Sequence, residues 1–225
     1  MSQNPDLQLT TTKAKLTRAL AIAKVTASPD KTLAILNAVS IGITERGNIV
    51  VQSTDRYLLS RTDLMPTGDV LLTDTFKQDG VTLALHYVGL VQKWLTLVDK
   101  YAAVTLVADS TGLTVSAPAA PTMTGVPCIE GKYPPLGKLA RPDEEVDHEV
   151  HDRAGAVTLS GRNVAKLGTI AGYCGRSEPV LLRPGTKASN NDLMFRFHDG
   201  DRIVTDGVIM GLRVGENDPA HQHGI

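Results

Sequence analysis

The chain has 225 residues, of which 42% are hydrophobic and 21% are charged, and its formal net charge is −1. These values are typical of a soluble globular protein that forms one large or two small domains around a real core. A net charge so close to zero excludes a protein that is basic over its whole surface and coats nucleic acid, but it leaves room for a local basic face.

The sequence also predicts the compartment in which the protein works. No apolar run approaches the ~20 residues that a membrane-spanning helix needs. The N-terminal residues are polar and lack the apolar core of a signal peptide. Cys128 and Cys174 lie far apart and form no CxxC motif, so we expect free thiols in a reducing environment. Together these features predict a cytoplasmic protein.

The first part of the chain predicts a strand, a helix and then three strands. The strand covers Leu7–Thr10, and Thr11-Thr12 are good N-cap residues for a helix from Lys13 to Ala27. Ser28-Pro29-Asp30 ends this helix. Three antiparallel strands follow, at Val39–Ile43, at Ile49–Val51 and within Ser53–Leu64.

The third of these strands contains the apolar run Tyr57-Leu58-Leu59, directly after the charged group Thr54-Asp55-Arg56. A strand that is buried on one face alternates polar and apolar residues, so three apolar side chains in a row must point to both faces. Two interpretations remain open here. The strand is buried on both faces, or it is an edge whose outward side chains contact something else.

Two further segments repeat this order of elements. In the second, VLLTDTF after Asp69 predicts a strand and a turn, followed by a helix over His86–Lys100 and strands at Val104–Val107, Leu113–Ala117 and Thr122–Pro127. The third predicts a strand at Ala156–Leu159, a helix over Arg162–Tyr173 with Ser160 as its N-cap and Gly175 as its stop, and strands at Val180–Leu182, Leu193–Phe197 and Val208–Met210, the last running on to Val214.

Three copies of one β-α-β-β-β unit predict an α+β fold in which each unit covers an apolar face of its neighbour. Residues 1–140 would form a first domain of two units, and residues 156–215 a second, reduced domain with one recognisable unit. Residues 141–155 are acidic and poor in apolar residues, which indicates a linker. We expect residues 216–225 to form a flexible tail.

Basic residues concentrate on the three predicted helices. No acid lies between Lys13 and Val25 or between Gly161 and Ser177, and Asp99 is the only acid of the second helix. The acids lie in the linker, the turns and the strands, which predicts a protein with one basic side. The alternative is that these residues form ordinary solvated helix faces. For any one helix, this alternative would be correct about half the time.

Catalytic and metal-binding motifs are nearly absent. There is no phosphate-binding GxGxxG or GxxxxGK[ST] loop and no GxSxG turn around a nucleophile. His148 and His151 could share a helix face beside Asp147 and Glu149 and bind one ion, which would suit a metal-dependent hydrolase. The alternative, an acidic linker that happens to contain histidines, is favoured because no packed surroundings are indicated. We therefore expect no enzyme, no metal and no cofactor.

Three stretches together resemble one protein family. ILNAVSIGITERGNIVVQSTDRYLLSRTDL (Ile35–Leu64) is similar to a segment of the bacterial DNA polymerase III beta subunits, the sliding clamps, which contains TD-x-x-R-L-A. GKYPPLGKLARP (Gly131–Pro142) resembles the family's EFPxxxxLLP segment, and VIMGLRV (Val208–Val214) resembles its C-terminal strand. Each motif alone is weak, but the three occur in the family's order.

The resemblance implies a DNA clamp fold, with helices lining a central hole and antiparallel sheets outside. A homo-oligomeric ring of this kind encircles double-stranded DNA and contacts its backbone without reading bases, and it acts as a processivity factor for the replicative polymerase. The positions expected to meet DNA are Lys13, Arg18, Lys24, Lys31, Lys93, Lys100, Arg162, Lys166 and Arg176.

The resemblance also implies an apolar pocket that receives short peptide motifs of the polymerase and the clamp loader. Carried over position by position, its residues are Leu36, Thr54, Tyr57, Leu59, Pro134, Leu139, Val208, Met210 and Leu212. Outward apolar side chains on the Tyr57-Leu58-Leu59 strand are explained if they anchor such a partner.

Three departures from the family pattern bear on these expectations. Tyr57-Leu58 stands where the family has a basic residue before the Leu, and Gly211 replaces a Pro of the last strand. Three units are found where bacterial subunits carry three domains of two units each, so the length is closer to that of two-domain clamps encoded by phages. Ring closure would then need three or four chains. The alternative is a clamp-fold adaptor that binds partner peptides without encircling DNA.

Overall fold

The structure, a computed structural model, describes residues 5–44, 46–136, 159–175, 180–184, 193–199 and 202–211. The first unit comprises β1 (Leu7–Thr12), α1 (Lys13–Thr26), β2 (Ala38–Ile43), β3 (Ile49–Thr54) and β4 (Leu58–Asp63). The second comprises β5 (Leu71–Leu72), α2 (Asp74–Asp79), β6 (Val81–Ala84), α3 (Leu85–Leu95), β7 (Ala103–Asp109), β8 (Gly112–Ser116) and β9 (Met123–Val126). The third contains α5 (Gly161–Cys174), β10 (Val180–Pro184), β11 (Leu193–Asp199) and β12 (Arg202–Ile209).

Local sequence explains the start of α1. Thr12 has extended backbone dihedral angles, and its Oγ1 accepts a hydrogen bond from the Lys15 N–H at 3.3 Å. One face of the helix, including Leu16, Leu20 and Ala23, is fully buried. Ser160 takes the corresponding N-cap position of α5, as expected, but its side chain forms no capping hydrogen bond.

The strands form two antiparallel sheets. The order of the five-stranded sheet is β5-β1-β7-β8-β9, and the order of the seven-stranded sheet is β10-β11-β12-β4-β3-β2-β6. The first two units exchange strands, because β1 pairs with β7 of the second unit while β6 pairs with β2 of the first. The predicted α+β class is therefore confirmed, and the first two units are interlocked.

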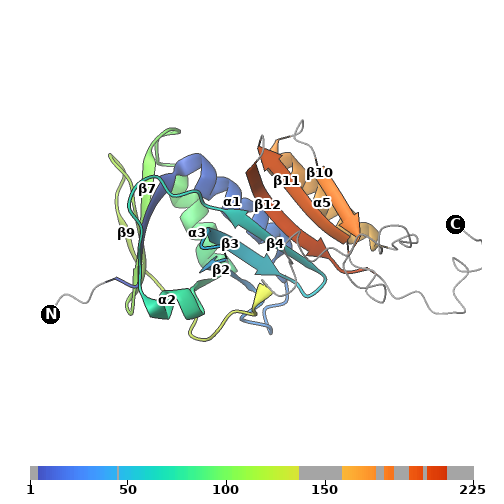
Figure 1. Ribbon diagram of the computed structural model, residues 1–225. Coiled ribbons are helices and arrows are strands. Elements are labelled where there is room, and N and C mark those ends of the chain that lie inside the picture. The colour runs from blue at the N-terminus through green and yellow to red at the C-terminus, as the bar shows by residue number, and fades with distance from the viewer. Residues whose placement is uncertain are drawn as a thin grey trace, which may run out of the picture.

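The helices form a layer of their own. Helix α1 lies between α3 and α5 and contacts both, behind the seven-stranded sheet in the view of Figure 1. The largest core packs α1 and α3 between the two sheets, and a second core packs α1 and α5 against β4, β11 and β12. A third, smaller apolar cluster contains no helix residue among its members.

The third unit continues the sheet of the first. Strands β4 and β12 are antiparallel neighbours, with Leu58 opposite Ile209 and Leu59 opposite Val208. Gly207 stands opposite Ser60 at this junction, where an added Cβ would come within 2.1 Å of the Leu59 carbonyl oxygen. The pairing therefore depends on a residue without a side chain.

The structure corrects several predicted boundaries. The second helix ends at Leu95, so the prediction that it extends to Lys100 is wrong. The Thr96 hydroxyl donates to the Lys93 carbonyl at 2.7 Å, and residues 96–98 continue only as single turns. Val98 still reaches the core, which explains the apolar pattern beyond the helix end.

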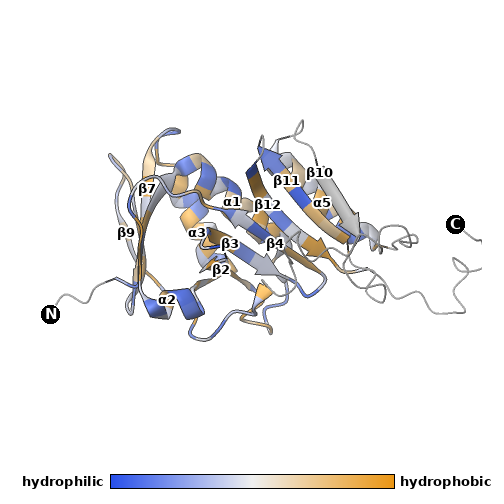
Figure 2. Cartoon of the chain, in the orientation of Figure 1, coloured by the Kyte–Doolittle hydropathy of each residue, from blue (hydrophilic) through white to orange (hydrophobic). Residues whose placement is uncertain are grey.

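The predictions for the stretch before α3 and for the last strand also need correction. The segment after Asp69 contains the short strand β5 and then α2, which is mostly hydrophilic apart from buried Phe76, and the strand before α3 is β6 (Figure 2). Strand β12 begins at Arg202, earlier than predicted, and ends at Ile209, so Met210 lies just beyond it. The strand predicted at residues 156–159 falls mainly outside the described residues.

Candidate functional site

The helix layer carries only positive charge among its ionised side chains. The sequences of α1, α3 and α5 contain no Asp or Glu. Lys24, Lys93 and Arg162 are exposed on these helices. Since α1 contacts both α3 and α5, these acid-free helices lie next to one another.

Two lysines of α1 are held by backbone oxygens. Lys13 Nζ donates to the Val98 carbonyl at 2.5 Å, and Lys15 Nζ donates to the Met65 carbonyl at 3.2 Å. Both side chains are half-buried. Their charges contribute to the potential of the helix layer, while their ammonium groups also tie the start of α1 to neighbouring loops.

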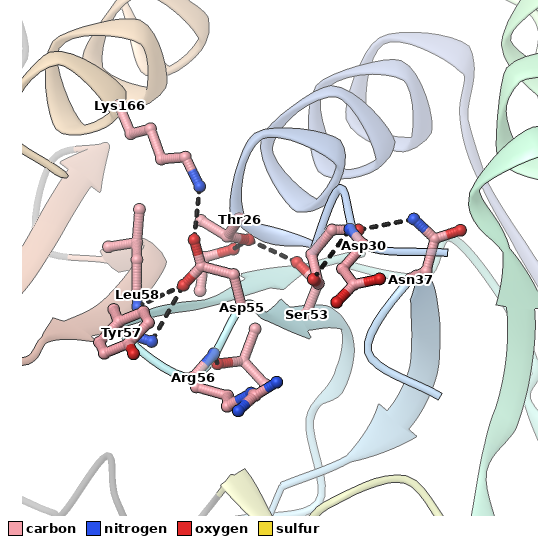
Figure 3. Close-up of polar contacts among 12 residues, drawn as sticks. Thr26, Asp30, Asn37, Ser53, Asp55, Arg56, Tyr57, Leu58 and Lys166 are labelled. Carbon is pink, nitrogen blue, oxygen red and sulfur yellow. Dashed lines mark hydrogen bonds and ion pairs between the residues drawn. The ribbon is translucent and has the colours of Figure 1, made fainter. Parts of the chain in front are cut away.

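Lys166 of α5 forms an ion pair inside the protein. Its Nζ lies 2.6 Å from Asp55 Oδ2, and the two side chains are 16% and 12% exposed. Asp55 Oδ1 accepts hydrogen bonds from the N–H groups of Tyr57 and Leu58, at 3.0 and 2.8 Å (Figure 3). One carboxylate therefore shapes the β3–β4 turn and binds the helix of the third unit to it.

A polar network lies behind this turn. Thr26 Oγ1 is hydrogen-bonded to Ser53 Oγ and, at 2.7 Å, to Ser60 Oγ, and the Ser53 hydroxyl donates to the Ala23 carbonyl at 2.6 Å (Figure 3). These side chains are fully buried and satisfy one another. They fix the end of α1 on strands β3 and β4.

We expect Lys166→Met to lower the free energy of unfolding by about 1–3 kcal/mol, because it leaves the Asp55 carboxylate without its cation in a poorly solvated place. The loss should stay below the roughly 3–5 kcal/mol of a fully buried pair, since the residual exposure lets water screen the charge. Urea unfolding measures it. Lys93→Met, on an exposed residue of α3, is the matched control and should change stability by no more than about 0.5 kcal/mol.

The structure answers the question raised by Tyr57-Leu58-Leu59. Tyr57 lies in the turn before β4 and is 60% exposed. Leu58 packs on the helix side of the sheet with Ile22 and Ile170, whereas Leu59 belongs to the small cluster on the opposite face. Both leucines are buried, so the strand is covered on both faces and only the tyrosine points outward.

The cluster around Leu59 is the apolar site of the outer face. Ala38, Leu59, Val208 and Met194 come from strands β2, β4, β12 and β11 of the seven-stranded sheet, and Tyr133 and Leu136 pack against them. We call these six residues the outer cluster. The Tyr133 hydroxyl oxygen accepts a hydrogen bond from the Thr54 N–H at 3.1 Å, and burial raises the pKa of this phenol. Tyr133 and Leu136 thus cover Leu59, which is 2% exposed.

Comparison with solved structures shows which proteins share this fold. A DNA polymerase sliding clamp from Pseudomonas aeruginosa matches 95% of this chain and 69% of its own, with a TM-score of 0.63 at 15% sequence identity. A DNA polymerase III subunit beta from Bartonella birtlesii, bound to griselimycin, matches 95% and 68% with a TM-score of 0.64 at 16% identity. A putative beta subunit from Eubacterium rectale matches 96% and 67% with a TM-score of 0.63 at 14% identity.

The chain has the fold of DNA sliding clamps. It spans about two thirds of the length of these clamps. No protein-family model matches the sequence, and no curated protein matches it either. The structural comparison confirms the predicted clamp fold. The sequence identity of about 15% is too low for the sequence comparisons to reveal this similarity.

The residues predicted to contact DNA take different positions in the clamp fold. Lys24, Lys93 and Arg162 are exposed on helices, Lys31 is exposed in the turn after α1, and Lys100 is exposed after the end of α3. Lys13, Arg18 and Lys166 are half-buried, and Arg176 lies outside the described residues. Asp55, the partner of Lys166, carries no signal in the sequence that would have assigned it this role.

The residues predicted for the peptide pocket are only partly brought together. Leu59 and Val208 share the outer cluster, and buried Thr54 is bonded to its Tyr133. Leu36, Pro134 and Met210 are half-buried, and Leu139 and Leu212 lie outside the described residues. Four members of the outer cluster were missed by sequence reasoning: Ala38, Tyr133, Leu136 and Met194. Tyr133 and Leu136 stand in the quoted GKYPPLGKLARP stretch, which could have indicated them.

Two other expectations concern metals and membranes. His148 and His151 lie outside the described residues, and the residues that are described contain no group of His, Cys, Asp or Glu that could hold a metal ion. Within the same part of the chain, none of the helices has the length and apolar character needed to cross a membrane.

Proposed function

We propose that this protein is a non-enzymatic processivity clamp that encircles double-stranded DNA and tethers a DNA polymerase to it. The observation that carries the proposal is the acid-free helix layer, which runs without interruption from α3 through α1 to α5. The likeness to solved sliding clamps over 95% of the chain supports it.

The helix layer is suited to holding DNA without reading its sequence. Exposed cations such as Lys24, Lys93 and Arg162 can neutralise phosphates, which are identical along the duplex. Few such cations are exposed, so the total affinity for phosphates is low and the protein can slide. Tight retention must then come from topology, in a closed ring of three or four chains.

The partner site is the outer surface around the β3–β4 turn. Tyr57 projects into solvent there, beside the outer cluster that contains Leu59 and Val208. An exposed aromatic residue next to a buried apolar cluster is a suitable anchor for a short peptide motif of a polymerase or a clamp loader. Leu36, Pro134 and Met210, which are half-buried, would complete the rim.

Topological binding is tested by loading the purified protein onto a nicked circular plasmid and then cutting the plasmid with a restriction enzyme. A ring should remain on the circle at a salt concentration that dissolves phosphate contacts, and should be lost within minutes of linearisation. Equal retention on circular and linear DNA would contradict encirclement. Purified loader or spontaneous ring opening can supply the loading step, so both conditions are run.

We expect the triple charge reversal Lys24→Glu, Lys93→Glu and Arg162→Glu to weaken DNA binding equally for unrelated sequences. It should also reduce the slope of log affinity against log salt by about 0.9 for each phosphate contact that is lost. Fluorescence anisotropy at several salt concentrations measures both quantities. Lys77→Glu with Lys132→Glu is the control and should leave the slope unchanged, because these residues lie beside Ser40, Gln52 and Arg61 on the outer face of the sheet and not on α1, α3 or α5.

A clamp-fold adaptor that binds partners without encircling DNA is the second candidate. One observation favours it: the cation of Lys166 is already paired with Asp55, and the other exposed residues of α5, apart from Arg162, are uncharged. Size-exclusion chromatography with light scattering separates the two. A closed oligomer at micromolar concentration supports the ring, whereas a monomer supports the adaptor.

A further inference from the structure

The outer face of the seven-stranded sheet carries a polar row next to the outer cluster. Thr82, Ser40, Gln52, Arg61 and Asp206 lie opposite one another in register, on the five consecutive strands β6, β2, β3, β4 and β12. Side chains alternate between the two faces of a strand, so residues two positions apart lie on the same face. The polar row is two positions from the apolar row that holds Leu59 and Val208, and both rows therefore lie on the outer face. An extended partner chain that crosses the outer cluster therefore meets hydrogen-bonding groups next.

A hollow of about 220 Å³ opens over part of this row. Its floor includes Ser40, Gln52 and Arg61, and its walls are the end of α2 and residues 132–136. Gly42 has no side chain in the hollow, where a Cβ would approach the Gln52 amide nitrogen to 3.1 Å. Since residues 133 and 136 also cover the outer cluster, the hollow and the cluster are adjacent.

One hydroxyl group that lines the hollow, that of Ser40, and one on the next strand, that of Thr82, have unsatisfied hydrogen bonds. Ser40 Oγ and the neighbouring Thr82 Oγ1 are buried without a hydrogen-bond partner among the described residues. Ser40 is only 1% exposed and Thr82 only 2%. Buried hydroxyls are normally paired, so such groups beside an open hollow indicate a missing partner. Arg61 differs, because Asp206 binds its guanidinium group through two hydrogen bonds.

The charges at the rim select the chemistry of that missing partner. Lys77 and Lys132 border the hollow with side chains that are 51% and 67% exposed. Their ion pairs with Asp74 and Asp79 are at the surface, where such pairs are worth little and exchange readily. Ammonium, hydroxyl and amide groups can all donate hydrogen bonds, and a carboxylate accepts several at once.

We infer that the hollow is a second contact site for partner proteins and takes the carboxylate of an Asp or Glu side chain next to their apolar anchor. One part of this inference rests on the proposed function, namely that the partner is a protein that also docks at the outer cluster. The partner would therefore carry an acidic residue beside its apolar motif. The hollow itself is tested without that motif and without DNA.

The experiment titrates hexaglutamate into ¹⁵N-labelled protein at low salt and follows the amide signals. We expect saturable shifts at Ser40, Gln52 and Lys132, and at least about tenfold weaker binding in the Lys77→Glu, Lys132→Glu double variant, since each lost charge-assisted hydrogen bond costs about that factor. Gln8→Glu changes the net charge in the same direction at an exposed residue of β1, in the other sheet, and should leave the affinity unchanged.

Ser40→Ala separates a ligand role from a structural one. The Ser40 hydroxyl has no hydrogen-bond partner in the described part of the chain, so its removal should not lower the melting temperature, but it should weaken hexaglutamate binding. The inference is overturned if hexaglutamate produces no saturable shifts, if Gln8→Glu weakens binding as much as the double variant, or if a 20-base-pair DNA duplex shifts the same signals more strongly. None of these outcomes depends on whether the protein encircles DNA.

Discussion

Leu59→Ala is expected to lower the free energy of unfolding by about 2–5 kcal/mol, the range found when a large buried side chain is cut back to Ala in a packed core. Leu59 is 2% exposed and packs with Val208, Tyr133 and Leu136, so the truncation leaves a cavity that four strands and a loop have to close. Urea unfolding followed by circular dichroism measures the change.

Tyr57→Ala is the matched control for that experiment. Tyr57 is 60% exposed and lies two residues away, so its truncation should change stability by no more than about 0.5 kcal/mol. An unchanged stability of Leu59→Ala would mean that the outer cluster is open in solution and that Leu59 is free to meet a partner. A large loss means that a partner must displace Tyr133 and Leu136 before it reaches Leu59.

Gly207→Ala should be the more damaging substitution, with a loss of at least about 3 kcal/mol. Overpacking of a core typically costs about 1–3 kcal/mol, and here the new Cβ would overlap a backbone atom. It would stand 2.1 Å from the Leu59 carbonyl oxygen and 2.3 Å from Cζ of Phe195. Strand β12 must then separate from β4, which disrupts the continuous sheet between the first and third units.

Gly168→Ala on α5 provides the control for Gly207→Ala. No atom lies within 4 Å of its added Cβ, and Ala is a better helix residue than Gly, so we expect a gain of about 0.5–1 kcal/mol. Thermal unfolding of both variants gives the comparison. Normal stability of Gly207→Ala would contradict the β4–β12 pairing, which is the only sheet contact between the third unit and the first among the described residues.

The sequence predicted the helices better than the strands between them. Helices α1 and α5 carry strong local signals, with N-cap residues Thr12 and Ser160 at their starts and Gly175 after the end of α5. The end of α3 was predicted too late, because Val98 keeps the helical apolar spacing although it reaches the core from a turn. Strand β6 was missed because four residues beside a short hydrophilic helix give too little periodicity to recognise.

In the candidate site, too, features within one segment could be predicted from the sequence, whereas contacts between distant segments could not. The absence of acids on the helices could be read directly from the sequence. The pairing of Lys166 with Asp55 joins residues 111 positions apart, and nothing local to either residue indicates it. The run Tyr57-Leu58-Leu59 was recognised as unusual, but its explanation required knowing that Tyr133 and Leu136 return to cover one face of the strand.

The strand exchange between the first two units has a consequence for the synthesis of the protein. Thr10 of β1 meets Thr105 of β7, which is 95 residues further along the chain. At about 5–20 residues per second, translation leaves β1 without its neighbour for roughly 5–20 s. During that time the nascent chain exposes the apolar side chains of Leu7 and Leu9, which are fully buried later. A ribosome-bound chain that stops before residue 103 should therefore bind chaperones, and the released full-length chain should not.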